Sequence, residues 1–257
     1  MILSVVIPVF NERQTLPAVL VAVAAALPEV VKEIVIVDDG STDGTREWLE
    51  STFPDDGGSF AAIDTTTEGV TFRTASVSAA PITIRVLYHP VNRGKGSALK
   101  TGFAATTGAV LVVQDADLEY DPSDWRRMYE FIALRGVADV VFGCRFYGLP
   151  HRSLYFHHFL ANRLISFIFN ALFNQTLMDI EVCYKMLRRE VLDDIELTCC
   201  DFGVEIELSA KIAKSRRWRI YETGVSYCGR TYEEGKKIGW RDGLKALWYL
   251  VKFRIMA

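Results

Sequence analysis

Two carboxylates that follow an apolar segment are the first residues of this sequence that could carry out chemistry. Residues 110–113 are all Val or Leu, and Asp115 and Asp117 come shortly after them. A fully buried strand of a parallel sheet has such an apolar run, and ligands bind beyond the carboxyl ends of these strands. Residues two apart in an extended chain point the same way. The pair could therefore hold one Mg²⁺ or Mn²⁺ and leave coordination positions open for phosphate oxygens.

A second pair of carboxylates follows another apolar run. Residues 34–37 are Ile-Val-Ile-Val, and Asp38 and Asp39 come next, before Gly40 and Ser41. Taken alone, either acidic pair is more typical of a turn or a helix cap than of a binding site. Two acidic strand ends in one chain nevertheless predict a shared crevice, because the carboxyl ends of parallel strands lie at the same edge of a sheet.

Composition restricts the class of protein. The chain has 257 residues, of which 50% are hydrophobic and 24% are charged, and its formal net charge is -3. These values fit one α/β domain with a large core and argue against a general nucleic-acid-binding protein. The five cysteines are odd in number and include no Cys-x-x-Cys pair. Reduced thiols in a cytosolic protein are therefore favoured over a zinc site or a disulfide framework.

Strand-like and helix-like segments alternate along the chain, which predicts βαβ units around a mostly parallel sheet flanked by helices. Strands are expected at residues 4–9, 33–37, 82–88, 109–114 and 138–142. Helices are expected at residues 16–27, 44–50, 96–105, 123–135, 155–173, 202–214 and 240–257. Residues 55–80 are rich in Gly, Ser, Thr and Ala and interrupt the alternation, so they predict a surface insertion, either a hairpin or a loop.

Neither a secretory leader nor a membrane-spanning helix is expected. Met1 leads directly into the first predicted strand, and no apolar stretch reaches the ~20 residues that a bilayer requires. Two predicted helices nevertheless suggest a membrane surface, because 155–173 has a wide apolar arc and 240–257 mixes aromatic with basic side chains. Packing against the sheet, or against a second subunit of a homo-oligomer, is the alternative for both. We predict a cytoplasmic protein that is peripheral on the cytoplasmic face of the membrane.

Two common nucleotide-binding patterns are missing. Residues 8–12 are Pro-Val-Phe-Asn-Glu, where a dinucleotide-binding fold would carry Gly-x-Gly-x-x-Gly, and residues 93–97 lack the upstream glycine of a phosphate loop. Four other segments occur in a fixed order and together resemble the nucleotide-sugar half of family 2 glycosyltransferases of GT-A fold. They are residues 6–12, 37–45, 92–96 and 115–118. The sequence is most similar to the branch of dolichyl-phosphate mannose and glucose synthases, which are polyprenyl-phosphate glycosyltransferases.

The resemblance implies one glycosyltransferase domain over residues 1–257. Residues 1–118 would form its nucleotide-sugar-binding half and include the insertion at 55–80. Residues 119–230 would form the acceptor half, and 231–257 a basic loop and a C-terminal amphipathic helix.

The resemblance also assigns candidate residues to a nucleotide-sugar donor. The donor-binding residues would be Pro8, Asn11, Glu12, Asp39, Lys95, Asp115 and Asp117. Asp39 would accept a hydrogen bond from the nucleobase, either uracil or guanine. Asp117, with Asp115 nearby, would ligate the metal, which neutralises the negative charge that grows on the departing diphosphate. Arg145 could reinforce this stabilisation, and a structural ion pair is its alternative role.

The implied reaction is an inverting transfer of a hexose from UDP or GDP to a dolichyl or undecaprenyl phosphate. A phosphate anion is already a nucleophile and needs only cations to position it. Candidate acceptor-binding cations are Lys185, Arg230, Lys236 and Lys237, for which a solvated basic loop is the alternative. Arg230 is also a candidate catalytic residue, because a guanidinium can bind phosphate oxygens through two hydrogen bonds.

Two other hypotheses stay open. A hydroxyl acceptor on a glycan or a small molecule would need a general base. The candidate bases are Asp179, Glu181, Asp201, Glu205 and Glu207, and we favour Asp201 or Glu205 among them. The third hypothesis is a non-catalytic module that binds a nucleotide sugar or a membrane. The complete pair of Asp115 and Asp117 argues against it, because a site without activity has little need of a metal.

Overall fold

The computed structural model describes residues 1–54, 57–60, 62–66, 69–73, 80–153, 155–231, 233–234 and 240–256. For residues 57–60, 62–66, 69–73, 240–242 and 256 it describes the backbone alone. Six strands of the main sheet run parallel to one another: β1 (Leu3–Val9), β2 (Lys32–Asp38), β6 (Ile82–Tyr88), β7 (Val110–Val113), β8 (Val140–Cys144) and β10 (Ile220–Gly224). Two run antiparallel to their neighbours: β3 (Gly57–Phe60) and β9 (Lys185–Arg188).

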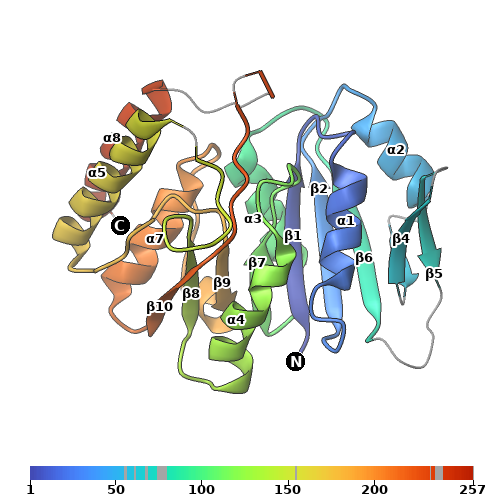
Figure 1. The fold of residues 1–257 in the computed structure, drawn as a ribbon, viewed down its shortest axis with the longest axis horizontal. Helices are drawn as coiled ribbons and strands as arrows, with labels where there is room; N and C mark the ends of the chain where they lie inside the picture. Colours follow the sequence, from blue (N-terminus) through green and yellow to red (C-terminus); the bar gives the residue numbers. More distant parts are fainter. Residues whose placement is uncertain are drawn as a thin grey trace.

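These strands form one eight-stranded sheet with the order β10-β8-β9-β7-β1-β2-β6-β3 (Figure 1). Every residue of β2, β7 and β8 is buried. Their apolar runs fit this position, because a strand covered on both faces has no solvent side that favours polar residues. The predicted α/β fold with a mostly parallel sheet is confirmed.

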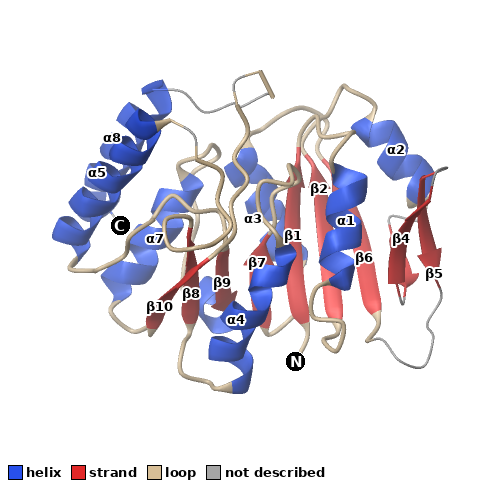
Figure 2. Cartoon of the chain, viewed as in Figure 1, coloured by secondary structure: helices blue, strands red, loops and turns tan. Residues whose placement is uncertain are grey.

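Helices cover both faces of the sheet (Figure 2). The helices α1 (Leu16–Ala25) and α4 (Trp125–Tyr129) lie on one face, and α3 (Lys95–Ala105) lies on the other (Figure 1). A 3-10 turn at Pro122–Asp124 precedes α4, and a π-helical turn at Glu130–Leu134 follows it. The other helices are α2 (Thr45–Thr52), α5 (Phe156–Phe173), α6 (Arg189–Asp193), α7 (Val204–Ser215) and α8 (Trp240–Met256).

The helices α5, α7 and α8 pack together at the end of the sheet that carries β10 (Figure 1). Both α5 and α8 also carry large apolar side chains on the face that points away from the core. The exposed ones are Phe156, Phe159, Leu160, Leu164 and Phe167 on α5, and Leu244, Trp248, Val251 and Ile255 on α8. Among the helices that the structure describes, none combines the length and apolar character required to cross a bilayer.

The predicted insertion forms strands where the structure describes it. β3 extends the main sheet beside β6, and β4 (Ala62–Thr66) pairs with β5 (Gly69–Arg73) in an antiparallel hairpin. The hairpin packs near α1, so this segment extends the domain at the end opposite to α5 and α8 (Figure 1).

Apart from one-residue shifts at the ends of β1, β2 and β7, three strands between β6 and the C-terminus differ from the sequence-based expectation. β8 begins and ends two residues later than predicted, and just before it the Asp139 carboxylate accepts hydrogen bonds from the backbone N–H and the guanidinium of Arg219. β9 and β10 were not predicted at all. β9 begins with the charged Lys185, and β10 carries Glu222, so neither has the continuous apolar run of a central strand.

Candidate donor and metal site

The predicted acidic strand ends lie at one edge of the sheet. β1 lies between β2 and β7 and runs parallel to both, so the segments that follow these three strands are neighbours. Asn11, directly after β1, connects two of them: its backbone N–H donates to Ser41 Oγ (2.9 Å), and its Oδ1 accepts the N–H of Thr42 (2.8 Å). Pro8 lies in β1 opposite Val37 of β2. The residues predicted to bind the donor thus surround one end of the central strands.

Three carboxylates of this edge surround the guanidinium of Arg230. Its Nη2 lies 2.9 Å from Asp117 Oδ2 and 3.1 Å from Glu12 Oε1, and its Nε lies 3.5 Å from Glu119 Oε1. The Tyr227 hydroxyl donates to the other Glu119 oxygen at 2.8 Å. Residues that are more than 200 positions apart in the sequence are therefore in direct contact, and Arg230 compensates part of the negative charge.

The electrostatics of Asp117 fit a metal ligand. Burial, together with the nearby charges of Asp115 and Glu119, raises its pKa to about 6, although Arg230 acts in the opposite direction. A carboxylate whose charge is destabilised in this way gains from a divalent cation, and carboxylate oxygens are the ligands that Mg²⁺ and Mn²⁺ prefer. Among the described side chains, however, no three acidic, histidine or cysteine groups are already arranged to hold a metal. Asp117 and Glu119 could hold one after Arg230 moves away.

Asp115 belongs to a separate chain of buried charges. Its Oδ1 lies 2.7 Å from Lys95 Nζ, which also lies 3.2 Å from Glu205 Oε1. Burial alone would raise the pKa of Asp115, but the Lys95 ammonium, the hydrogen bond from Cys183 and the charge of Lys185 together outweigh burial and lower the pKa. Glu205 Oε2 in turn lies 2.8 Å from Lys185 Nζ. Lys95 is therefore fixed between two carboxylates at the donor edge.

Asp39 holds the turn that precedes Lys95. The backbone N–H groups of Arg93 and Gly94 donate to its oxygens at 3.0 and 2.7 Å, and His89 Nδ1 lies 2.6 Å from Oδ1. The residue is only 2% exposed. These contacts position the turn, and a nucleobase N–H would have to share the same two oxygens.

The glycines of this turn allow a close backbone approach. Gly94 has a φ of +91°, and a Cβ there would lie 2.4 Å from the carbonyl oxygen of Cys200. A Cβ on Gly96 would lie 2.5 Å from the carbonyl oxygen of Cys199. Because any larger residue would collide with backbone, these glycines fix the turn against the segment that leads into α7, which carries Glu205.

Comparison with known proteins agrees with this arrangement. Residues 4–196 match the family model described as glycosyl transferase family 2. The chain belongs to this family. It is therefore a glycosyltransferase, and the resemblance predicted from its motifs is confirmed.

Several curated relatives of this glycosyltransferase are named as polyprenyl-phosphate enzymes. The polyprenol monophosphomannose synthase of Mycolicibacterium smegmatis is 28% identical over 86% of this chain and 73% of its own. The undecaprenyl-phosphate mannosyltransferase of Micrococcus luteus is 25% identical over 97% of both chains. Other relatives are longer: the chain spans 62% of the undecaprenyl-phosphate 4-deoxy-4-formamido-L-arabinose transferase of Aeromonas hydrophila, with 27% identity.

Solved structures share the fold. The glucosyl-3-phosphoglycerate synthase of Mycobacterium tuberculosis, solved in complex with Mn²⁺, UDP and phosphoglyceric acid, superposes with a TM-score of 0.68. The match covers 99% of this chain and 79% of that one, with 19% sequence identity. It supports the predicted GT-A fold.

Two candidate cations of the glycosyltransferase, Arg145 and Lys185, are held in buried ion pairs. Arg145 forms a bidentate ion pair with the buried Asp179, at 2.6 and 2.7 Å, which is the structural alternative for this residue. Lys185 is fully buried and donates to Glu205 and to the carbonyl oxygen of Val182. Its ammonium therefore cannot reach an acceptor, and this prediction is wrong. Lys236 and Lys237 lie outside the described residues.

Glu119 belongs to the site but is not among the residues predicted from the sequence. It follows Asp117 by two residues, the same spacing that separates Asp115 from Asp117. The sequence signal for Glu119 is the carboxylate at every second position from 115 to 119. The contact between Glu12 and Arg230 has no such local signal, since it depends on how the segment after β10 folds back onto the end of β1.

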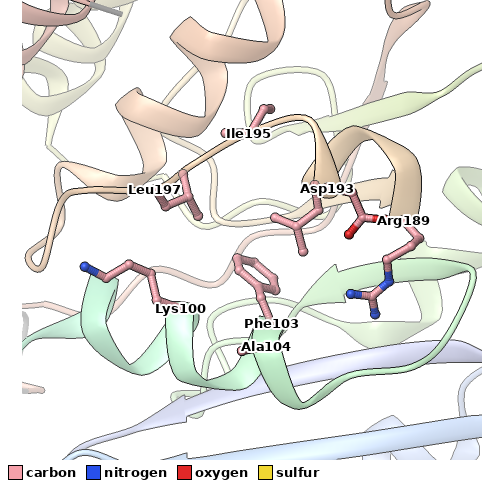
Figure 3. Close-up of a pocket in the computed structure, with 8 residues that line it drawn as sticks. Lys100, Phe103, Ala104, Arg189, Asp193, Ile195 and Leu197 are labelled. Carbon is pink, nitrogen blue, oxygen red and sulfur yellow. The ribbon is translucent and has the colours of Figure 1, made fainter.

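A cavity of about 420 Å³ lies away from this edge, between α3 and the segment around α6 (Figure 3). Its lining residues are Lys100, Phe103, Ala104, Arg189, Leu192, Asp193, Ile195 and Leu197. The Arg189 guanidinium is already hydrogen-bonded to Thr106 and to the carbonyl oxygen of Gly108. The cavity is lined by one carboxylate, Asp193, and by none of Glu12, Asp117 and Glu119. The strand ends therefore fit a metal and a diphosphate better than this cavity does.

Proposed function

We propose that this enzyme is an inverting, metal-dependent glycosyltransferase that moves a hexose from UDP or GDP to a polyprenyl phosphate. The observation that carries the proposal is the position of Arg230. A guanidinium, which suits a phosphate acceptor, lies 2.9 Å from the carboxylate that suits the metal. The names of the M. smegmatis and M. luteus relatives support the same class of acceptor.

Each group of the site has a defined task in this reaction. A Mg²⁺ or Mn²⁺ bound by Asp117, with Asp115 and Glu119 nearby, would supply positive charge to the departing diphosphate. Lys95 offers a second cation at the same edge, and its position is fixed by Asp115 and Glu205. Arg230 would bind the acceptor phosphate and orient one of its oxygens toward the sugar.

The candidate general bases favour a phosphate acceptor over a hydroxyl acceptor. Both oxygens of Asp201 accept the Tyr249 hydroxyl at 2.9 Å, and one also accepts the N–H of Gly203. Glu205 is paired with Lys185 and Lys95. A general base must have an oxygen free to take a proton from its substrate, and these contacts occupy the oxygens of both carboxylates. A phosphate anion needs no such base.

The exposed faces of α5 and α8 fit a lipid acceptor. Aromatic and aliphatic side chains such as Phe167 and Trp248 are 69% and 58% exposed, and the basic Lys245 and Arg254 of α8 are exposed beside them. Such a surface can insert its apolar groups at a bilayer interface while its basic groups contact anionic headgroups. We propose that these helices hold the enzyme peripherally on the cytoplasmic face of the membrane.

A transfer assay tests the proposed function. The protein would be incubated with labelled UDP- or GDP-hexoses, Mn²⁺ and vesicles containing undecaprenyl phosphate, and the lipid fraction would then be extracted. We expect label in the lipid fraction with at least one donor, and none with Asp117→Asn or with a chelator. Transfer only to water-soluble hydroxyl acceptors would contradict the proposed acceptor. Lack of metal dependence would contradict the proposed role of Asp117.

A further inference from the structure

The guanidinium of Arg230 lies where the proposed metal would have to bind. Asp117 Oδ1 accepts the N–H of Glu119 at 3.1 Å, whereas Oδ2 faces Arg230 Nη2 at 2.9 Å. The guanidinium also contacts Glu12 and Glu119. One delocalised positive charge thus compensates three carboxylates, and it contacts the Asp117 oxygen that is not bound to the backbone.

The backbone around Arg230 is anchored independently of its side chain. The N–H of Arg230 donates to Glu119 Oε1 at 2.9 Å, and the N–H of Cys228 donates to the Glu119 carbonyl oxygen at 2.8 Å. Tyr227 forms a β-bridge with Tyr120. The guanidinium itself borders solvent, with the side chain 21% exposed. The side chain can therefore leave Asp117 by rotation while the loop stays in place.

We propose that Arg230 is a resident cation of this site, which the divalent metal must displace from Asp117 Oδ2. The inference rests on the proposed function, since it takes Asp117 as the metal ligand. The metal would bind the same oxygen that the guanidinium contacts, and the repulsion between two cations at one oxygen would force the guanidinium away. Displacement frees the guanidinium for the acceptor phosphate. Metal loading and acceptor binding are thereby linked through one side chain.

The test is Mn²⁺ binding without nucleotide, measured by the loss of the free Mn²⁺ signal in electron paramagnetic resonance. Arg230→Met should bind Mn²⁺ roughly tenfold or more tightly than the wild type, because the metal no longer has to break a hydrogen bond between charged groups. Arg126→Met is the matched control, since it removes an exposed guanidinium paired with Glu29 and should leave the affinity unchanged. Arg230→Gln replaces Arg230→Met if the latter is unstable.

Salt separates direct displacement from a general effect of charge. In about 1 M KCl the Debye length is ~3 Å, so a long-range attraction of Mn²⁺ to the more acidic variant should disappear. The difference caused by displacement should persist. Equal Mn²⁺ affinities of wild type and Arg230→Met, or a difference that vanishes in salt, would overturn the inference and leave the proposed function intact. If neither protein binds Mn²⁺ more tightly than Asp117→Asn does, the metal site itself is refuted.

Discussion

Replacing Arg145 with methionine should destabilise the protein far more than it slows sugar transfer. The two guanidinium nitrogens lie 2.6 and 2.7 Å from the oxygens of Asp179, which has no exposed surface. Methionine keeps an unbranched apolar side chain but leaves that carboxylate buried without its partner. Breaking a buried ion pair in this way costs about 3–5 kcal/mol. In a chain of this length the loss corresponds to a decrease in Tm of roughly 6–20 °C.

Circular dichroism during heating measures this decrease in Tm, and two further variants serve as comparisons. Arg219 also forms a bidentate pair, with Asp139, but its side chain is 53% exposed, so Arg219→Met should cost less than about 1 kcal/mol. Adding Asp179→Asn to Arg145→Met removes the buried negative charge that has lost its guanidinium partner. The double variant should therefore be more stable than the sum of the single effects predicts.

The turnover number distinguishes a stabilising role of Arg145 from a catalytic role. If Arg145 stabilises the fold, kcat of Arg145→Met stays within a few-fold of wild type at temperatures well below its Tm. An unchanged Tm combined with a loss of about 100-fold or more in kcat would refute the argument, because a loss of that size is typical of a group that stabilises charge in the transition state.

Three further predictions concern Glu222, Asp39 and Trp248. Burial raises the pKa of Glu222 to about 7 from its ordinary 4.5, so the folded state binds more protons than the unfolded state between these values. Stability should consequently fall as the pH rises from 4.5 to 7, and Glu222→Gln, compared with wild type by urea unfolding across this range, should remove that part of the fall. Asp39→Asn should lower the free energy of unfolding by about 1–3 kcal/mol and weaken UDP or GDP binding in calorimetry, because the turn at 92–95 loses acceptor oxygens. Unchanged stability with lost affinity would instead favour direct contact with the nucleobase. Trp248→Glu on α8 should reduce cosedimentation with anionic vesicles, whereas Leu134→Glu, at a still more exposed apolar position on another element, should not.

The central strands and their acidic ends could be predicted because their signals are local. Residues 110–113 and 34–37 are apolar without interruption, and a strand with such a run has only one stable environment, the middle of a covered sheet. The order of the four motifs then identified the family. Residues placed by this local pattern, such as Asp117, lie at the expected edge.

Other parts depended on pairings that no local pattern reveals. Lys185 begins a buried strand because Glu205, twenty positions later, compensates its charge. A sequence shows the lysine but not its partner, so a cation for the acceptor was the natural interpretation. Asp39 was assigned to the nucleobase by resemblance, whereas its oxygens hold the backbone of a turn fifty-four positions later.

The most direct test of the central claim compares Arg230→Met with Asp201→Asn in transfer to undecaprenyl phosphate. If the nucleophile is a phosphate anion held by a guanidinium, Arg230→Met should lower kcat/KM for the acceptor at least about tenfold, with the KM for the donor changed only slightly. Asp201→Asn should stay within a few-fold of wild type, since no base is required. An inactive Asp201→Asn together with a fully active Arg230→Met would contradict the account and indicate a hydroxyl acceptor.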